Sequence, residues 1–416
     1  MKSFIQYISE AISSEKNLHI SHLEEMPVFE GRDGLKKVFT YINSIIKQLS
    51  GQEDINVQLK TKIDGAPALI VGINPENGKF FVGTKSVFNK FEPKINYTNE
   101  DIDKNHDEPG LNKKLKVALK YLPELGIKTI FQGDMLYTSD DLKRKNIKGQ
   151  DYVIFRPNTI TYAVPVDSSL AKEILASKMG IVFHTEYLGS SISALKAHFK
   201  TDLSKLKPSK NVFYRDADFD NVGKKTGISK EKLDSLKKKE KNIKALSSSI
   251  DQTFLDKMEH DQDLQMLIST YTNFLVRKGE TEKSEAEKFK QLQQYARDKI
   301  EGEMSTLKTE KGKERRKKKL DYIMNILIHN DNSIRNFFKL QNEITNFKLD
   351  VIDLFNKMQK NLHTYLDKDG TYEKTNPEGI VVVSNDGATK LIDRSEFSRA
   401  NFNLPKQWDR EKWKRP

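Results

Sequence analysis

The sequence of 416 residues contains no cysteine. Disulfide bonds, cysteine-ligated zinc, iron–sulfur clusters and thiol nucleophiles are therefore excluded. The chain also has no apolar run near the roughly 18 residues that a membrane-spanning helix needs. The stretch from Met1 to Glu10 has no small-residue cleavage pattern and is typical of an amphipathic helix, not of a signal peptide. We therefore expect no membrane partner.

Two common catalytic motifs are also missing. The P-loop pattern G-x-x-x-x-G-K-[ST] does not occur, since Gly223-Lys224 is followed by Lys225. The metal-binding pattern H-E-x-x-H is absent too, and the eight histidines are scattered along the chain. One of them, His184, lies in an apolar segment and is interpreted as a structural histidine.

Positive charge is plentiful and unevenly distributed. The formal net charge is +12, and half of it comes from the nine residues between Lys311 and Lys319. A second basic cluster lies between Lys224 and Lys244. Such clusters are typical of surfaces that bind nucleic acid, although a solvated loop between helices is the alternative. We expect a monomer that binds nucleic acid, such as a nicked duplex or RNA ends, through these two clusters.

The spacing of apolar residues and the composition change along the chain. Apolar residues at three- and four-residue steps predict a helical N-terminal part. Short apolar runs then predict strands, with a hairpin at the turn Asn77-Gly78. A helical stretch rich in Lys, Glu and Leu follows, and a last hairpin has its turn at Asp386-Gly387. The fold class is thus α+β, in four segments: residues 1–50, 51–215, 216–368 and 369–416.

The clearest helical signal lies near the end of the third segment. Apolar residues recur there at steps of three and four from Phe337 to Leu362. This pattern predicts the buried seam of a long helix that packs on other helices.

The sharpest chemical signal is Lys62-Ile63-Asp64-Gly65. A lysine attacks phosphorus only as the neutral amine, and the neighbouring bases Lys60 and Lys85 would favour that form by repulsion. The glycine would let the backbone turn sharply before the next strand. The alternative interpretation is a charged turn that precedes a strand.

This motif is the first of an ordered series that resembles the covalent nucleotidyltransferase superfamily, which includes ATP-dependent DNA and RNA ligases and capping enzymes. Five later segments of this chain are similar to the superfamily's later motifs, in the same order. They are Thr84-Lys85-Ser86, Phe131-Gln132-Gly133-Asp134, Gly180-Ile181-Val182-Phe183, Glu378-Gly379-Ile380-Val381 and Thr389-Lys390-Leu391-Ile392. The resemblance implies an ATP-grasp-like adenylation domain of antiparallel sheets, interrupted by the helical segment. The whole chain also resembles uncharacterised proteins of large tailed phages, which implies the cytoplasm of an infected bacterium.

The resemblance also implies roles for individual residues. The catalytic residues would be Lys62, Asp64 and Lys390, with Lys62 as the nucleophile. The nucleotide ATP would be bound by a set that includes the ribose contact Asp134 and the base-stacking ring Phe183. The full expected nucleotide-binding set is Lys60, Lys85, Asp134, Phe183, Glu378, Lys390 and Arg394. Magnesium would be held by Glu378 and Asp134.

The chain departs from the superfamily pattern in several places. Pro67 stands where DNA ligases usually carry an arginine, and Asp134 stands where the third motif usually has glutamate. Ile392 occupies the place of a second lysine, for which Arg394 would compensate. We expect no C-terminal OB-fold, since only residues 398–416 follow Phe397.

The implied function is an ATP-dependent polynucleotide ligase that joins 5′-phosphate and 3′-hydroxyl ends through a lysyl-AMP intermediate, on DNA or RNA. The helical segment would act as the substrate clamp, so deletion of residues 220–365 would spare self-adenylation. The alternatives are a capping-type guanylyltransferase, a catalytically inactive relative that only binds nucleic acid, and a helical interaction or virion protein.

Overall fold

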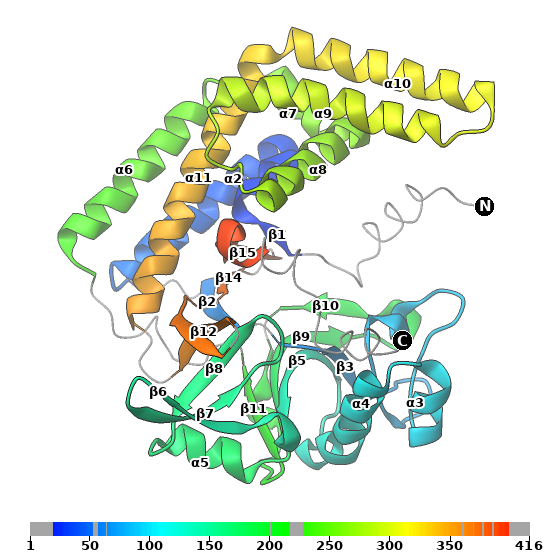
Figure 1. Cartoon of the computed structure of the whole chain (residues 1–416), viewed down its shortest axis with the longest axis vertical. Coiled ribbons are helices and arrows are strands. Elements are labelled where there is room, and N and C mark those ends of the chain that lie inside the picture. Colours follow the sequence, from blue (N-terminus) through cyan, green and yellow to red (C-terminus); the bar gives the residue numbers. More distant parts are fainter. Residues whose placement is uncertain are drawn as a thin grey trace.

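The computed structural model describes residues 20–52, 57–63, 65–199, 201–216, 228–358, 362–368, 370–376, 378–384 and 387–398. It has a helical body at one end and a β-rich part at the other (Figure 1). The predicted α+β class is confirmed, and the sheets consist mainly of antiparallel strand pairs. No helix in the described ranges is long and apolar enough to cross a membrane.

The helical body combines the N-terminal helix with the long third segment. Its members are α2 (Met26–Leu49), α6 (Lys230–Ser247), α7 (Gln252–His260), α8 (Gln262–Lys278), α9 (Glu285–Ser305), α10 (Glu310–His329) and α11 (Asp331–Met358). The α2 helix packs against α6, α7 and α8 and shares one hydrophobic core with them. The segment predicted as a separate N-terminal unit is therefore part of the helical body.

The predicted apolar seam is confirmed in α11. Phe337, Leu340, Ile344 and Val351 are all fully buried, as a stripe at helical spacing requires. The helix ends at Met358, before Leu362, which packs instead in a core of the β-rich part.

A four-stranded sheet lies beneath the helical body, in the order β1-β15-β14-β2. Its strands are β1 (Ser21–His22), β2 (Val57–Lys62), β14 (Gly379–Ser384) and β15 (Gly387–Ile392). The predicted last hairpin is confirmed as β14 and β15, and β14 also pairs antiparallel with β2. The sheet thus joins residues near position 60 to residues near position 380.

A second sheet has the order β10-β9-β5-β3-β4, and β11 pairs parallel with β9. Its strands are β3 (Ala68–Ile73), β4 (Phe80–Gly83), β5 (Ile130–Thr138), β9 (Met179–Leu188), β10 (Lys196–His198) and β11 (Val212–Asp216). The hairpin predicted at Asn77-Gly78 is confirmed by the pairing of β3 with β4. Two helices, α3 (Asn99–Asn105) and α4 (Pro109–Tyr121), lie beside this sheet (Figure 1).

The third sheet has the order β13-β12-β8-β7-β6, with α5 (Ser169–Ala176) packed beside β8. Its strands are β6 (Lys143–Ile147), β7 (Gln150–Phe155), β8 (Ile160–Pro165), β12 (His363–Lys368) and β13 (Thr371–Lys374). The chain therefore returns to the β-rich part at His363, earlier than the predicted boundary at residue 369. The reason is the antiparallel pairing of β12 with β8, which the alternation in the sequence did not reveal.

Candidate functional site

The first sheet presents two chemically different faces. Leu59, Ile380, Val382 and Leu391 alternate with the motif residues and pack into the core of the helical body. The opposite face carries Lys60 and Lys62 of β2, Val381 of β14 and Lys390 of β15, because side chains two residues apart lie on one face. The register places Lys60 opposite Val381, and Val381 opposite Lys390.

Lys62 lies at the end of β2, where its backbone is opposite Gly379. Its ammonium group forms an ion pair with the carboxylate of Glu378. The Lys62 side chain is 27% exposed and that of Glu378 only 7%. Two motifs 316 residues apart in sequence therefore meet in one partly buried ion pair that solvent still reaches from the lysine side.

Lys390 on β15 is the second lysine of this face. Burial, together with the positive charge of Lys62, lowers the pKa of Lys390 to about 8, although Glu25 and Glu378 oppose the shift. Lys62 thus repels Lys390, which is a different pair from the predicted repulsion of Lys62 by Lys60 and Lys85.

The two lysines expected to repel Lys62 are placed differently from the prediction. Lys60 Nζ donates to both carboxylate oxygens of Asp216, at 2.8 and 2.9 Å, so its charge is balanced locally. Lys85 was expected on a strand. It lies instead in an exposed 3₁₀ turn (Lys85–Phe88) that Thr84 caps. Asp216 was missed because nothing in its local sequence indicates that β11 ends beside β2.

Asp134 on β5 lies next to the turn that follows Lys62. The Ala66 amide donates to the Met135 carbonyl at 2.9 Å. A Cβ at Gly65 would lie only 2.6 Å from Asp134 Cβ, so the motif glycine permits this close approach. The carboxylate of Asp134 also faces His184, whose Nε2 lies 3.7 Å from Oδ2.

His184 therefore lies beside Asp134 at the candidate site, and its interpretation as a structural histidine stays a prediction. Its side chain is 28% exposed, and its Nδ1 lies 2.8 Å from the Thr185 hydroxyl. Phe183, the neighbour on the opposite face of β9, is fully buried and its ring packs 5.3 Å from that of Phe131. The prediction that Phe183 stacks on a base is wrong here, because a core position leaves no face of the ring accessible.

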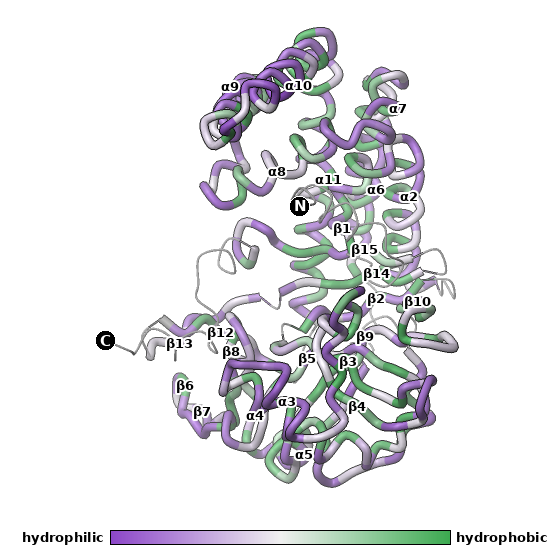
Figure 2. Tube along the Cα trace, turned by 90° about the vertical axis from the view of Figure 1, so that its right-hand side faces the viewer, coloured by the Kyte–Doolittle hydropathy of each residue, from purple (hydrophilic) through white to green (hydrophobic). Residues whose placement is uncertain are grey.

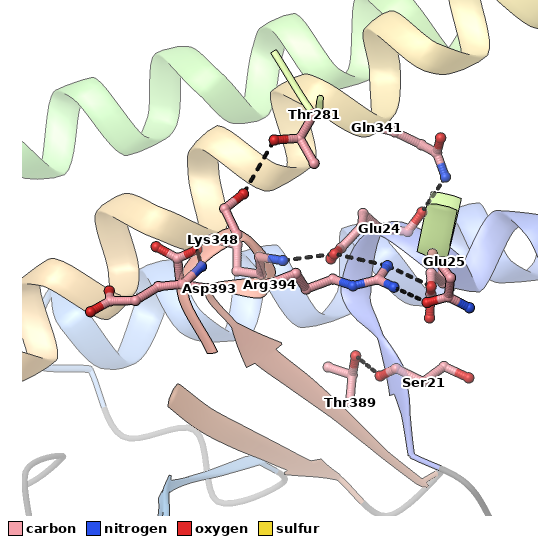
Figure 3. A network of polar contacts seen from close by, with 12 residues as sticks. Ser21, Glu24, Glu25, Thr281, Gln341, Lys348, Thr389, Asp393 and Arg394 are labelled. Carbon is pink, nitrogen blue, oxygen red and sulfur yellow. Dashed lines mark hydrogen bonds and ion pairs between the residues drawn. The ribbon is translucent and has the colours of Figure 1, made fainter. Parts of the chain in front are cut away.

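The side chain of Arg394 points towards Glu25 and Asn273. Its guanidinium is buried between the helical body and the end of β15 (Figure 3). There Nη1 donates to Glu25 at 2.6 Å and Nη2 donates to Asn273 at 2.6 Å. The prediction that Arg394 binds the nucleotide is wrong, since its outer nitrogens are already engaged by protein groups. Ile392 is likewise buried.

Three of the predicted site residues keep their expected roles only as predictions. Asp64 lies outside the described residues, so its catalytic role stays a prediction. The roles of Glu378 and Asp134 as magnesium ligands also stay predictions. Within the described ranges, no group of three or more His, Asp or Glu side chains could hold a metal ion. The two carboxylates fit a magnesium ion bound mainly by substrate phosphates better than a fully protein-ligated one.

The basic cluster of residues 311–319 is partly neutralised in α10. Four of its cations form ion pairs: Lys313 with Glu310, Arg316 with Glu303, Lys318 with Glu314 and Lys319 with Asp263. The α10 helix also lies at the end of the molecule farthest from the sheets, in a strongly hydrophilic region (Figure 2).

The second basic cluster lies mainly on α6, and its first residues, Lys224 and Lys225, fall outside the described residues. Lys237, Lys241 and Lys244 follow one another at helical spacing along the exposed face. None of these three forms an ion pair with any residue that the structure describes. The α6 helix therefore presents a stripe of three exposed lysines, unpaired among the described residues, while Lys239 beside it pairs with Asp350.

Comparison with known proteins gives a single family assignment. No curated protein and no solved structure matches the chain at a significant level. The DUF6267 family model, described as a family of unknown function, matches residues 17–406. Because this match covers nearly the whole sequence, the chain belongs to the DUF6267 family.

Proposed function

We propose that this protein is an ATP-dependent polynucleotide ligase that acts through a lysyl-AMP on Lys62. The observation that carries the proposal is the ion pair between Lys62 and Glu378, with Lys390 on the same face of the sheet. A nucleophilic amine, a carboxylate to take its proton and a second cation for phosphate are the groups that adenylyl transfer to lysine needs.

In the first step, Lys62 Nζ gives a proton to Glu378 and attacks the α-phosphorus of ATP. An N–P bond forms, the P–O bond to the β-phosphate breaks, and pyrophosphate leaves with the bonding electrons. A 5′-phosphate oxygen then attacks the same phosphorus, the N–P bond breaks and Nζ regains a proton. Finally a 3′-hydroxyl attacks the activated 5′-phosphorus, which forms the phosphodiester, releases AMP and leaves the hydroxyl proton to a base.

The other residues of the site would position the nucleotide. A bound α-phosphate would favour the charged form of Lys390, whose pKa the protein lowers in its absence. Asp134 and His184 would contact the ribose and base, with the imidazole of His184 in place of a phenyl ring. Lys85 would reach the triphosphate from its exposed turn. These contacts lower the barrier by positioning and by charge neutralisation.

Magnesium would be bound by Glu378 and Asp134 together with the triphosphate oxygens. The ion would supply neutralisation of the charge on the leaving pyrophosphate.

The proposal is tested by incubating the full chain with ATP labelled at the α-phosphate, with magnesium, before denaturing electrophoresis. We expect the label to remain on the wild-type protein and to be lost in Lys62→Arg. Lys79→Ala is the matched control, because Lys79 is an exposed lysine outside the proposed site, and we expect it to keep the full label. Label that persists in Lys62→Arg would contradict the proposal.

Two further comparisons separate the alternatives. Labelling by GTP in preference to ATP would indicate a capping-type guanylyltransferase. Binding of nucleic acid without any labelled protein would indicate an inactive relative. Joining of nicked DNA, a nicked DNA–RNA hybrid and single-stranded RNA, measured side by side, assigns the substrate.

A further inference from the structure

A polar cavity of about 170 Å³ lies where α8, α9 and α11 meet the residues that follow β15. Three cations and three acids line it: Lys288, Lys348 and Arg394, with Glu24, Glu282 and Asp393. None of these residues belongs to the proposed adenylation site. The volume corresponds to roughly five water molecules, which is enough for one tetrahedral oxyanion.

Two buried cationic groups in this cavity have hydrogen-bond donors to spare. Arg394 Nε is buried and has no partner among the described residues. Lys288 is only 4% exposed, and its Nζ donates to the amide oxygen of Asn342 at 2.8 Å. No carboxylate in the described part of the chain forms an ion pair with Lys288. Burial lowers the pKa of the Lys288 ammonium, and the carboxylates of Glu282 and Glu285 offset the shift only in part.

One buried acceptor in the same cavity is also unsatisfied. Glu24 Oε1 accepts from Lys348 at 2.7 Å and lies 4.0 Å from Arg394 Nη1. Figure 3 shows both contacts. Glu24 Oε2 is buried and has no partner among the described residues. A bound anion would therefore meet this oxygen and the carboxylates of Glu282 and Asp393, which also line the cavity. A carboxylate oxygen repels an anion unless the anion itself donates a hydrogen bond to it.

We propose that this cavity binds hydrogen phosphate. Its charged oxygens would accept from Lys288 and Arg394, while its P–OH group would donate to Glu24 Oε2. Sulfate has the same shape but carries no hydroxyl at neutral pH, so it would leave Glu24 facing an anion without a hydrogen bond. The site does not depend on the proposed ligase activity, and it would tie α9 and α11 to the segment after β15.

The test is isothermal titration of the full chain with sodium phosphate and with sodium sulfate, at pH 7 and matched ionic strength. We expect phosphate to bind at least tenfold more tightly than sulfate. Lys288→Gln should weaken phosphate binding at least tenfold, whereas Lys290→Gln, an exposed position on the same helix, should leave it unchanged. Lys62→Ala should also leave it unchanged, which separates this site from the proposed adenylation site.

Asn342→Asp is a second variant, and it keeps the buried charge of Lys288. It would place a carboxylate beside Lys288 and should abolish phosphate binding while the melting temperature stays the same or rises. Equal affinity for phosphate and sulfate, or phosphate binding that survives both Lys288→Gln and Asn342→Asp, would overturn the proposal. No measurable binding of either anion would show that the cavity holds water only.

Discussion

Lys390 is a half-buried lysine whose positive charge the fold disfavours. Its pKa falls from 10.5 to about 8 because burial and Lys62 both penalise the ammonium form. The unfolded chain therefore binds more protons than the folded one between these values. It follows that Lys390 costs stability below pH 8, and that this cost disappears as the pH rises towards 10.5.

Lys390→Met keeps the apolar stem and removes the charge. We expect it to raise the free energy of unfolding at pH 7 by about 1–3 kcal/mol, since each pKa unit corresponds to about 1.4 kcal/mol. The gain should shrink when denaturant unfolding is repeated at pH 9 and pH 10. A gain that does not change with pH, or a loss at every pH, would contradict the stated cause. The same variant should lose self-adenylation if Lys390 binds phosphate.

The sequence predicted the positions of some candidate-site residues correctly and of others not. The meeting of Lys62 and Glu378 was expected only from the resemblance to the nucleotidyltransferase motifs, since no local pattern relates residues 316 apart. The Phe183 prediction failed because the side chains of a strand alternate. Neighbouring residues of a strand point to opposite faces, so a shift of one residue decides which side chain faces the candidate site. Here Phe183 faces the core and His184 faces Asp134.

Among the elements, α6 and α10 carry similar basic runs but differ in surroundings. The α10 run is largely compensated by acids on its own and neighbouring helices, whereas the exposed stripe of α6 is not. Charge density in a sequence predicts total charge, but its compensation depends on which helices pack together. This is why the two runs could not be ranked from the sequence.

Reversal of the α6 stripe by Lys237→Glu, Lys241→Glu and Lys244→Glu should weaken binding to nicked duplex DNA. If the three lysines contact phosphates, the plot of log binding constant against log salt should become shallower by about 2–3. Binding can be measured by fluorescence anisotropy at several salt concentrations.

The matched control is reversal of three exposed cations of α10, Lys311, Arg315 and Lys317, which form no ion pair within the described part of the chain. We expect a smaller change in slope, because α10 lies far from the sheet that carries Lys62. An equal or larger effect of the α10 variant would show that α10 is the main phosphate contact.

At the scale of the whole molecule, the helical segment is not a separable insertion. Its helices share a hydrophobic core with α2 and with Ile380, Val382 and Leu391 of the sheet that carries the site. The sequence showed the helices and the last hairpin, because each has a local periodicity or turn. Their common core could not be predicted, since it depends on contacts between distant segments that leave no local pattern.

Deletion of residues 220–365 should therefore yield an unfolded or aggregated protein, contrary to the expectation of an adenylating core. The deletion would expose the helix-facing side of the sheet and remove Lys348, the partner of Glu24. Size-exclusion chromatography and thermal unfolding measure the outcome. A soluble deletion variant with cooperative unfolding and normal self-adenylation would show that the two parts fold independently.

The central claim concerns which amine carries AMP, and peptide mapping by mass spectrometry tests it most directly. After incubation with ATP and magnesium, digestion under alkaline conditions should preserve the phosphoramidate. The account predicts one AMP on the peptide that contains Lys62 and none on the peptide that contains Lys390. AMP on Lys390, or no AMP on any lysine, would contradict it.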